Sequence, residues 1–169
     1  MSRHKAMQYM IWESFDELGG IRYPEQIDID KSDKEWVKKL SWRDLDWEQI
    51  GDNGRNIVWL QLKVPLDTDI LKKGVVVDIQ IIQETLYQIH ITLAEELRGI
   101  GLGTKIYRSL VDWLGHIYSG KGRRQNPIIN KVWKRLGKAM DVTCASNDLG
   151  DICISDKNPM KSKLLKIFG

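Results

Sequence analysis

The glycine-rich segment Leu97-Arg98-Gly99-Ile100-Gly101-Leu102-Gly103-Thr104 separates the β-rich middle of the chain from the helical pattern that follows. It lies between an expected strand and an expected helix. Its glycines let backbone N–H groups approach an anion closely. The helix that follows adds unpaired N–H groups and the positive end of its dipole. The stretch therefore predicts a phosphate-binding loop, with a glycine-rich strand–helix turn as the simpler alternative.

Two widespread phosphate-binding motifs do not fit this loop. The dinucleotide-binding pattern G-x-G-x-x-G has a different spacing and belongs to a parallel βαβ unit early in the chain. The P-loop pattern G-x-x-x-x-G-K-[S/T] needs a Lys before the hydroxyl residue. Here Thr104 precedes Lys105, so the order is reversed. Both of these nucleotide-binding classes are therefore excluded by the spacing.

The residues before the loop favour β structure. Strands are expected at 57–64, 75–82 and 86–92, since each run is rich in β-branched residues. Pro65 ends the first of them, and the short connection 83–85 joins the other two. These strands should form an antiparallel meander.

Further upstream, a first strand is expected at 6–12. Ser32 followed by Glu35 predicts a helix start, and that helix should run to Leu40. A second short helix, capped by Ser41, should follow and carry three apolar residues: Leu45, Trp47 and Ile50. Residues 52–54, Asp-Asn-Gly, predict a turn.

The hydrophobic period becomes helical after the loop. A helix is expected from Gly103 to about Tyr118, ended by glycines 120 and 122, and a second from 126 to 136. The apolar stripe of the first of these helices consists of Ile106, Leu110, Trp113, Leu114 and Ile117. Strands 140–146 and 151–155 should flank a turn at 147–150. The basic tail 157–169 adds a last short helix.

Composition narrows the class of protein. The chain has 26 Lys+Arg and 23 Asp+Glu in 169 residues, so its net charge of +3 does not indicate a nucleic-acid binder. The basic residues gather in 121–138 and the acidic ones in 13–50. The chain has no run of 18 apolar residues for a membrane span.

Cys144 and Cys153 should face each other across the last hairpin. Two reduced thiols in a cytoplasmic protein are the preferred interpretation, and a cross-strand disulfide is the alternative.

Arg98, Gly101 and Gly103 match in register the acyl-CoA loop [Q/R]-x-x-G-x-[G/A] of the GNAT superfamily of N-acyltransferases. A second landmark of that family is an Asn opening a helix, an aromatic residue seven positions later, and a closing Leu-Gly. Asn126, Trp133 and Leu136-Gly137 occupy these places. The chain therefore resembles this family over about residues 6–156, and the stretch 119–124 is similar to GNAT-like proteins of bacteriophages.

The resemblance implies an α/β (α+β) domain over residues 1–156, followed by the basic tail. Its central sheet should be mixed and mostly antiparallel, with helices on both faces. The implied activity is transfer of an acetyl group from acetyl-CoA, as cosubstrate, to an amine on a small molecule or a protein. No metal is expected. The protein would lie in the cytoplasm, that of the host if phage-encoded, or in the virion.

The resemblance also assigns site residues. The pyrophosphate would bind the N–H groups of five residues: Arg98, Gly99, Gly101, Gly103 and Thr104. The pantetheine would lie along Ile91–Leu93 like an added strand. The N–H of Leu93 would face the thioester oxygen and stabilise the oxyanion. Asn126 would bridge the splayed strands or touch the pantetheine.

This chain departs from the family at Trp133. The family usually has a Tyr there, whose hydroxyl protonates the leaving thiolate, and an indole N–H is no useful proton source. A core aromatic is the simpler interpretation of Trp133. The candidate bases are Glu84, Asp78 and His90. Glu84 is most simply a solvated charge in a turn, and His90 a structural residue.

A second function class follows from the same residues. Trp133, the lack of a convincing base and the count of seven tryptophans also suit a protein that kept the fold and lost the chemistry. Such a chain would be a structural or interaction subunit of a larger assembly, such as a phage particle. If the chain is an enzyme, the acidic segment 13–50 favours a cationic acceptor.

Overall fold

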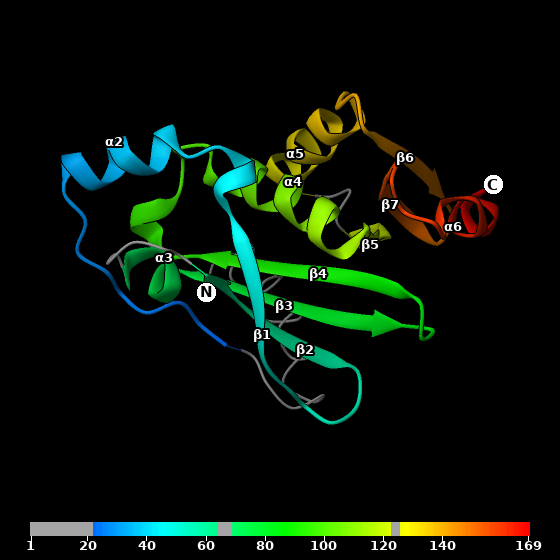
Figure 1. Cartoon of the computed structure of the whole chain (residues 1–169), viewed down its shortest axis with the longest axis horizontal. Coiled ribbons are helices and arrows are strands. Elements are labelled where there is room, and N and C mark those ends of the chain that lie inside the picture. Colours follow the sequence, from blue (N-terminus) through cyan, green and yellow to red (C-terminus); the bar gives the residue numbers. More distant parts are fainter. Residues whose placement is uncertain (1–21, 64–68, 123–125) are drawn as a thin grey trace.

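The computed structural model describes residues 22–63, 69–122 and 126–169, and it contains one seven-stranded sheet (Figure 1). Every neighbouring pair of strands is antiparallel except β4 and β5, which are parallel. In spatial order the strands are β1 (Asp46–Asp52), β2 (Ile57–Lys63), β3 (Val75–Ile82), β4 (Leu86–Leu93), β5 (His116–Gly120), β7 (Gly150–Ser155) and β6 (Val142–Asn147). The expected α+β class with a mixed, mostly antiparallel sheet is therefore confirmed.

Helices cover both faces of this sheet. In the described residues they are α2 (Lys31–Lys39), α3 (Asp69–Gly74), α4 (Leu102–Leu114), α5 (Pro127–Gly137) and α6 (Lys161–Phe168). Because neighbouring strand residues point to opposite faces, Ile117 and Tyr118 of β5 belong to different clusters. Ile117 joins the main core with residues of α4 and α5. Tyr118 joins a smaller cluster with Leu164 and Phe168 of α6. None of the described helices is long and apolar enough to cross a bilayer.

The central meander forms as expected. β2, β3 and β4 are antiparallel neighbours, and β3 and β4 pair over their full length from Val75↔Leu93 to Ile82↔Leu86. The connection between them is a tight turn in which Gln83 and Glu84 have φ angles of 51° and 63°. Positive φ values match the twist of a hairpin. The expected strand at 6–12 lies outside the described residues.

The prediction of a second short helix after Ser41 is wrong. Ser41 does cap a turn, where its hydroxyl accepts from the N–H of Arg43 at 3.3 Å, but this 3-10 turn ends at Asp44. Leu45 then leads into strand β1. Trp47 pairs with Leu62 of β2, and its side chain is 2% exposed. A buried tryptophan on a sheet ladder outweighs a weak helical signal. Ile50 lies at a register shift and is 49% exposed.

Two helix boundaries also differ from expectation. α2 begins two residues earlier than expected, because Asp30 and Asp33 form the capping box in place of Ser32 and Glu35. α4 ends at Leu114 and not near Tyr118. Gly115 stops it with a φ of 89°, a left-handed conformation that glycine adopts without strain. The residues after Gly115 then form β5.

The C-terminal part agrees with expectation. α5 ends at Gly137, β6 and β7 form the expected hairpin, and the tail contains α6. Cys144 and Cys153 are paired across this hairpin. They form a disulfide, so the preferred interpretation of two reduced thiols is corrected in favour of its alternative.

Candidate functional site at the fork between β4 and β5

β4 and β5 are joined by one bridge, Gln88↔Tyr118. By contrast, β5 and β7 are paired at five positions, from His116↔Ile154 to Gly120↔Gly150. Beyond the bridge the two parallel strands separate. In Figure 1, the short strand β5 lies beside β4, whereas the β6–β7 hairpin lies apart from the β1–β4 part of the sheet. The sheet is therefore forked at its centre.

The backbone of β4 presents alternate residues to this fork. The N–H of Ala94 donates to the carbonyl of Gly74 at 2.8 Å, so Ala94 bonds toward the β3 side. Bonding residues alternate in an antiparallel ladder, so Ile91 and Leu93 turn their N–H and C=O groups the other way. The N–H of Tyr87, in the same phase, donates to His116 Nε2 at 3.2 Å. No described residue pairs with Ile91 or Leu93 in a ladder on that side.

His116 closes the narrow end of the fork. Its ring stacks on Tyr87 with 4.6 Å between ring centroids and 10° between the planes. The side chain is 5% exposed, and this burial lowers its pKa from 6.5 to about 4. The imidazole is therefore neutral at pH 7, as an acceptor at Nε2 must be.

This lowered pKa predicts a pH-dependent stability. As pH falls below 6.5, His116 becomes protonated in the unfolded chain but stays neutral in the folded protein. The free energy of unfolding therefore decreases until the pH reaches the folded pKa. Between pH 7 and pH 5 the loss from His116 should be about 2 kcal/mol. His116→Gln keeps an acceptor and does not titrate. Urea unfolding at both pH values should show a loss smaller by that amount in the variant, and equal losses in both proteins would contradict the assignment.

The glycine loop lies at the wide end of the fork. Gly99 and Gly101 have φ angles of 76° and 82°, and Gly101 is the residue before α4, whose N-terminus receives no side-chain cap. A Cβ built at Gly99, Gly101 or Gly103 meets no atom of the described residues within 4 Å. The loop is tied to the open edge of β4, since Arg98 Nε donates to the carbonyl of Leu93 at 3.1 Å. Uncapped N–H groups at a helix start favour an anion.

Two cationic residues near the loop were not anticipated from the sequence. Lys105 donates from Nζ to the carbonyl of Lys38 at 2.7 Å and so binds the C-terminal end of α2 to α4. Arg135 of α5 lies with Nη1 at 3.4 Å from Thr104 Oγ1. A Lys in the first turn of a helix opposes the helix dipole, and that was the one available signal for Lys105.

The candidate bases lie in different places. Glu84 is exposed in the turn between β3 and β4, at the opposite end of β4 from Leu93, a separation of about 23 Å along the strand. His90 lies in the ladder opposite Asp78, and burial lowers its pKa to about 4. The Asp78 carboxylate is occupied by Arg22, which donates from Nε to Oδ1 at 2.8 Å. Only His90 lies close to Leu93 along the chain.

Asn126 and Trp133, from the second family landmark, make structural contacts. Asn126 accepts at Oδ1 from the N–H groups of Ile128 and Ile129, at 3.0 and 3.3 Å, and so caps α5. Trp133 is 7% exposed within the main core, with its ring 6.4 Å from that of Tyr107. The core-aromatic interpretation of Trp133 is confirmed.

The described residues contain no group of His, Cys, Asp and Glu side chains that could hold a metal ion. No protein-family model matches this chain, and no curated protein matches it.

Proposed function

We propose that this chain binds acetyl-CoA in the fork and transfers its acetyl group to an amine, as an acyltransferase of the GNAT type. One observation carries the proposal. The bond from Arg98 to the Leu93 carbonyl holds the glycine loop beside a strand edge that has no ladder partner among the described residues. Acetyl-CoA has the matching order of groups, since its pyrophosphate continues into a pantetheine arm that carries amides. The pyrophosphate would bind the loop, and the amides would pair with Ile91 and Leu93.

The N–H of Leu93, which has no ladder partner among the described residues, supplies the chemistry. An acceptor amine attacks the thioester carbonyl, a C–N bond forms, and the negative charge that develops on oxygen is stabilised by this N–H. Such a preorganised donor contributes about 3–4 kcal/mol to lowering the barrier. The C–S bond then breaks, and CoA leaves as a thiolate.

His90 is the best candidate for the base. It is neutral at pH 7, and an incoming ammonium would have to give up its proton before the amine attacks, but the lowered pKa of about 4 makes His90 a weak base for that step. Glu84 is too distant for this role. The leaving thiolate takes its proton from solvent in this proposal, because Trp133 has no acidic hydroxyl. The acidic segment 13–50 favours a cationic acceptor, on a small molecule or a protein.

A second candidate function is an inactive subunit of a larger assembly that keeps this fold. The observation that favours it is the burial of Trp133 in the main core, at the family's usual position for the proton-donating Tyr. The two candidates differ in one measurable property, since an assembly subunit needs no acetyl-CoA.

Calorimetry with acetyl-CoA tests the proposal. Gly103→Asp places a negative charge in the proposed cradle, and repulsion of about 3 kcal/mol at 5 Å should weaken binding about a hundredfold. Gly103 is helical and has open space around it, so the substitution adds no backbone strain. An Asp in the first turn is favourable for the helix, so Tm should not fall.

Gly103→Asn is the matched control, because it has the same shape without the charge. It should weaken binding much less than Gly103→Asp. If the native protein fails to bind acetyl-CoA at millimolar concentration, the acyltransferase proposal is wrong and the assembly subunit takes its place.

A further inference from the structure

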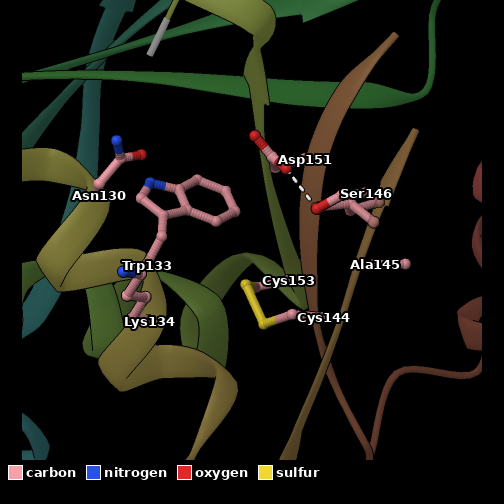
Figure 2. A pocket seen from close by; sticks show the side chains of 9 residues that line it. Asn130, Trp133, Lys134, Cys144, Ala145, Ser146, Asp151 and Cys153 are labelled. Carbon is pink, nitrogen blue, oxygen red and sulfur yellow. Dashed lines mark hydrogen bonds between the residues drawn. A yellow bond between two sulfur atoms is a disulfide. The ribbon is translucent and has the colours of Figure 1, made fainter. Parts of the chain in front are cut away.

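A pocket of about 210 Å³ lies between α5 and the β6–β7 hairpin (Figure 2). Residues from both elements line it, and the Cys144–Cys153 disulfide is part of its wall. The side chains of Lys134, Trp133 and Asp151 also line it. The pocket therefore gives a small molecule access to a disulfide.

The two sulfur-bearing residues differ in exposure. Cys144 on the edge strand β6 is exposed, whereas Cys153 on β7 is 0% exposed and belongs to the main core. Thiol–disulfide exchange requires a thiolate to reach one of the two sulfurs directly. Of the two residues, Cys144 is therefore the one that the folded protein exposes to a thiolate.

We propose that this pocket is a thiol-exchange site at which a small thiol modifies Cys144. The thiolate attacks Cys144 Sγ, the bond to Cys153 Sγ breaks, and a mixed disulfide forms. Cys153 leaves as a thiolate and takes up the proton that the attacking thiol released. One thiol is consumed and one is produced, so no separate oxidant or reductant is needed. Attack by Cys153 on the mixed disulfide restores the starting state.

Lys134 defines the class of thiol. Its ammonium is the positive charge among the residues that line the pocket. The Asp151 carboxylate accepts a hydrogen bond at Oδ1 from the Ser146 hydroxyl, which offsets part of its charge (Figure 2). The site therefore favours a small thiol that carries a carboxylate over a neutral thiol. Glutathione is the probe of this class, and 2-mercaptoethanol is a smaller thiol without charge.

The test begins with the oxidised native protein and reduced glutathione. After acid quenching, peptide mass spectrometry should find glutathione on Cys144 and a newly alkylatable thiol at Cys153. Lys134→Ala should slow the reaction with glutathione about two- to fivefold, the range of an exposed charge pair, and leave the rate with 2-mercaptoethanol unchanged. An adduct on Cys153, or equal effects of Lys134→Ala on both thiols, would overturn the proposal.

Two single-thiol variants provide the control for access. Cys153→Ala leaves Cys144 on the surface, and oxidised glutathione should convert it to a stable mixed disulfide. Cys144→Ala leaves Cys153 in the core, and it should react at least about tenfold more slowly until denaturant is added, because a buried thiol reacts through opening of the structure. Equal rates for the two folded variants would rule out selective access through the pocket.

Discussion

Replacing Arg22 with Met should lower the free energy of unfolding by about 3–5 kcal/mol at pH 7. Arg22 donates from Nε and Nη2 to Asp78 Oδ1, at 2.8 and 2.5 Å, and Nη2 also reaches the carbonyl of Val77 at 2.7 Å. Asp78 is 1% exposed, and its Oδ2 has no hydrogen-bond partner among the residues that the structure describes. Without Arg22, a buried carboxylate would remain with no compensating charge. The loss is a large part of the stability of an ordinary domain.

The pH dependence identifies the cause. Burial raises the pKa of Asp78, and Arg22 opposes that rise. A carboxyl with a raised folded pKa is favoured in its protonated form, so its contribution is fully present at low pH and is lost as pH rises through the folded pKa. In Arg22→Met the pKa of Asp78 rises further. The deficit relative to the native protein should therefore shrink as pH falls, which urea unfolding at several pH values will show.

A double variant separates the charge from the packing. Arg22→Met combined with Asp78→Leu removes both members of the ion pair, and its stability should return to within about 1 kcal/mol of the native value. If the double variant is as unstable as Arg22→Met alone, the loss comes from packing and the electrostatic explanation is wrong.

Gly150→Ala should have an even larger effect, a loss of about 4 kcal/mol or more, enough to prevent folding of a marginal domain. Gly150 begins β7 with a φ of 148°, and a Cβ there would lie 2.2 Å from the carbonyl oxygen of Ser119. Both backbones belong to the β5–β7 ladder, so neither moves without breaking the pairing. Circular dichroism during urea unfolding measures the loss.

Gly120→Ala is the matched control. Gly120 is the residue paired with Gly150 across the same ladder, yet a Cβ at Gly120 meets no atom within 4 Å in the described part of the chain. This variant should lose no more than about 1 kcal/mol, the modest cost typical of a substitution without a steric clash. Equal losses at the two glycines would mean that the contact with Ser119 is not the cause.

The sequence predicts those elements whose signals are local. The β-branched runs of β2 to β4 and the glycine that ends α5 are found where the pattern places them. The residues 45–50 are ambiguous, because their apolar spacing suits a helix as well as a strand. Two contacts select the strand for these residues. They are the pairing with strand β2 and the hydrogen bond from Trp47 Nε1 to Ser109 Oγ at 3.0 Å, and the signal for them is not local in the sequence.

In the candidate site, too, the residues with a local sequence motif are predicted and the others are not. The glycines of the loop have a motif, and the open edge at Leu93 follows from the resemblance that this motif supports. His116, Lys105 and Arg135 have no motif, because each acts on a residue from another part of the chain. Their roles depend on how the strands and helices pack, and periodicity contains no information about such pairs.

The fork also bears on the behaviour of the protein in concentrated solution. Strand edges usually lie at the rim of a sheet, where charges and bulges protect them, as the register shift in β1 does here. The segment of β4 at Ile91 and Leu93 is an edge inside the sheet with apolar side chains, where Arg98 occupies the Leu93 carbonyl but no ladder partner in the described chain covers the N–H groups. Any extended peptide that enters the fork meets the same hydrogen-bonding groups as a ligand. Aggregation by strand addition is therefore the liability that accompanies this binding geometry, and an occupant of the fork suppresses it.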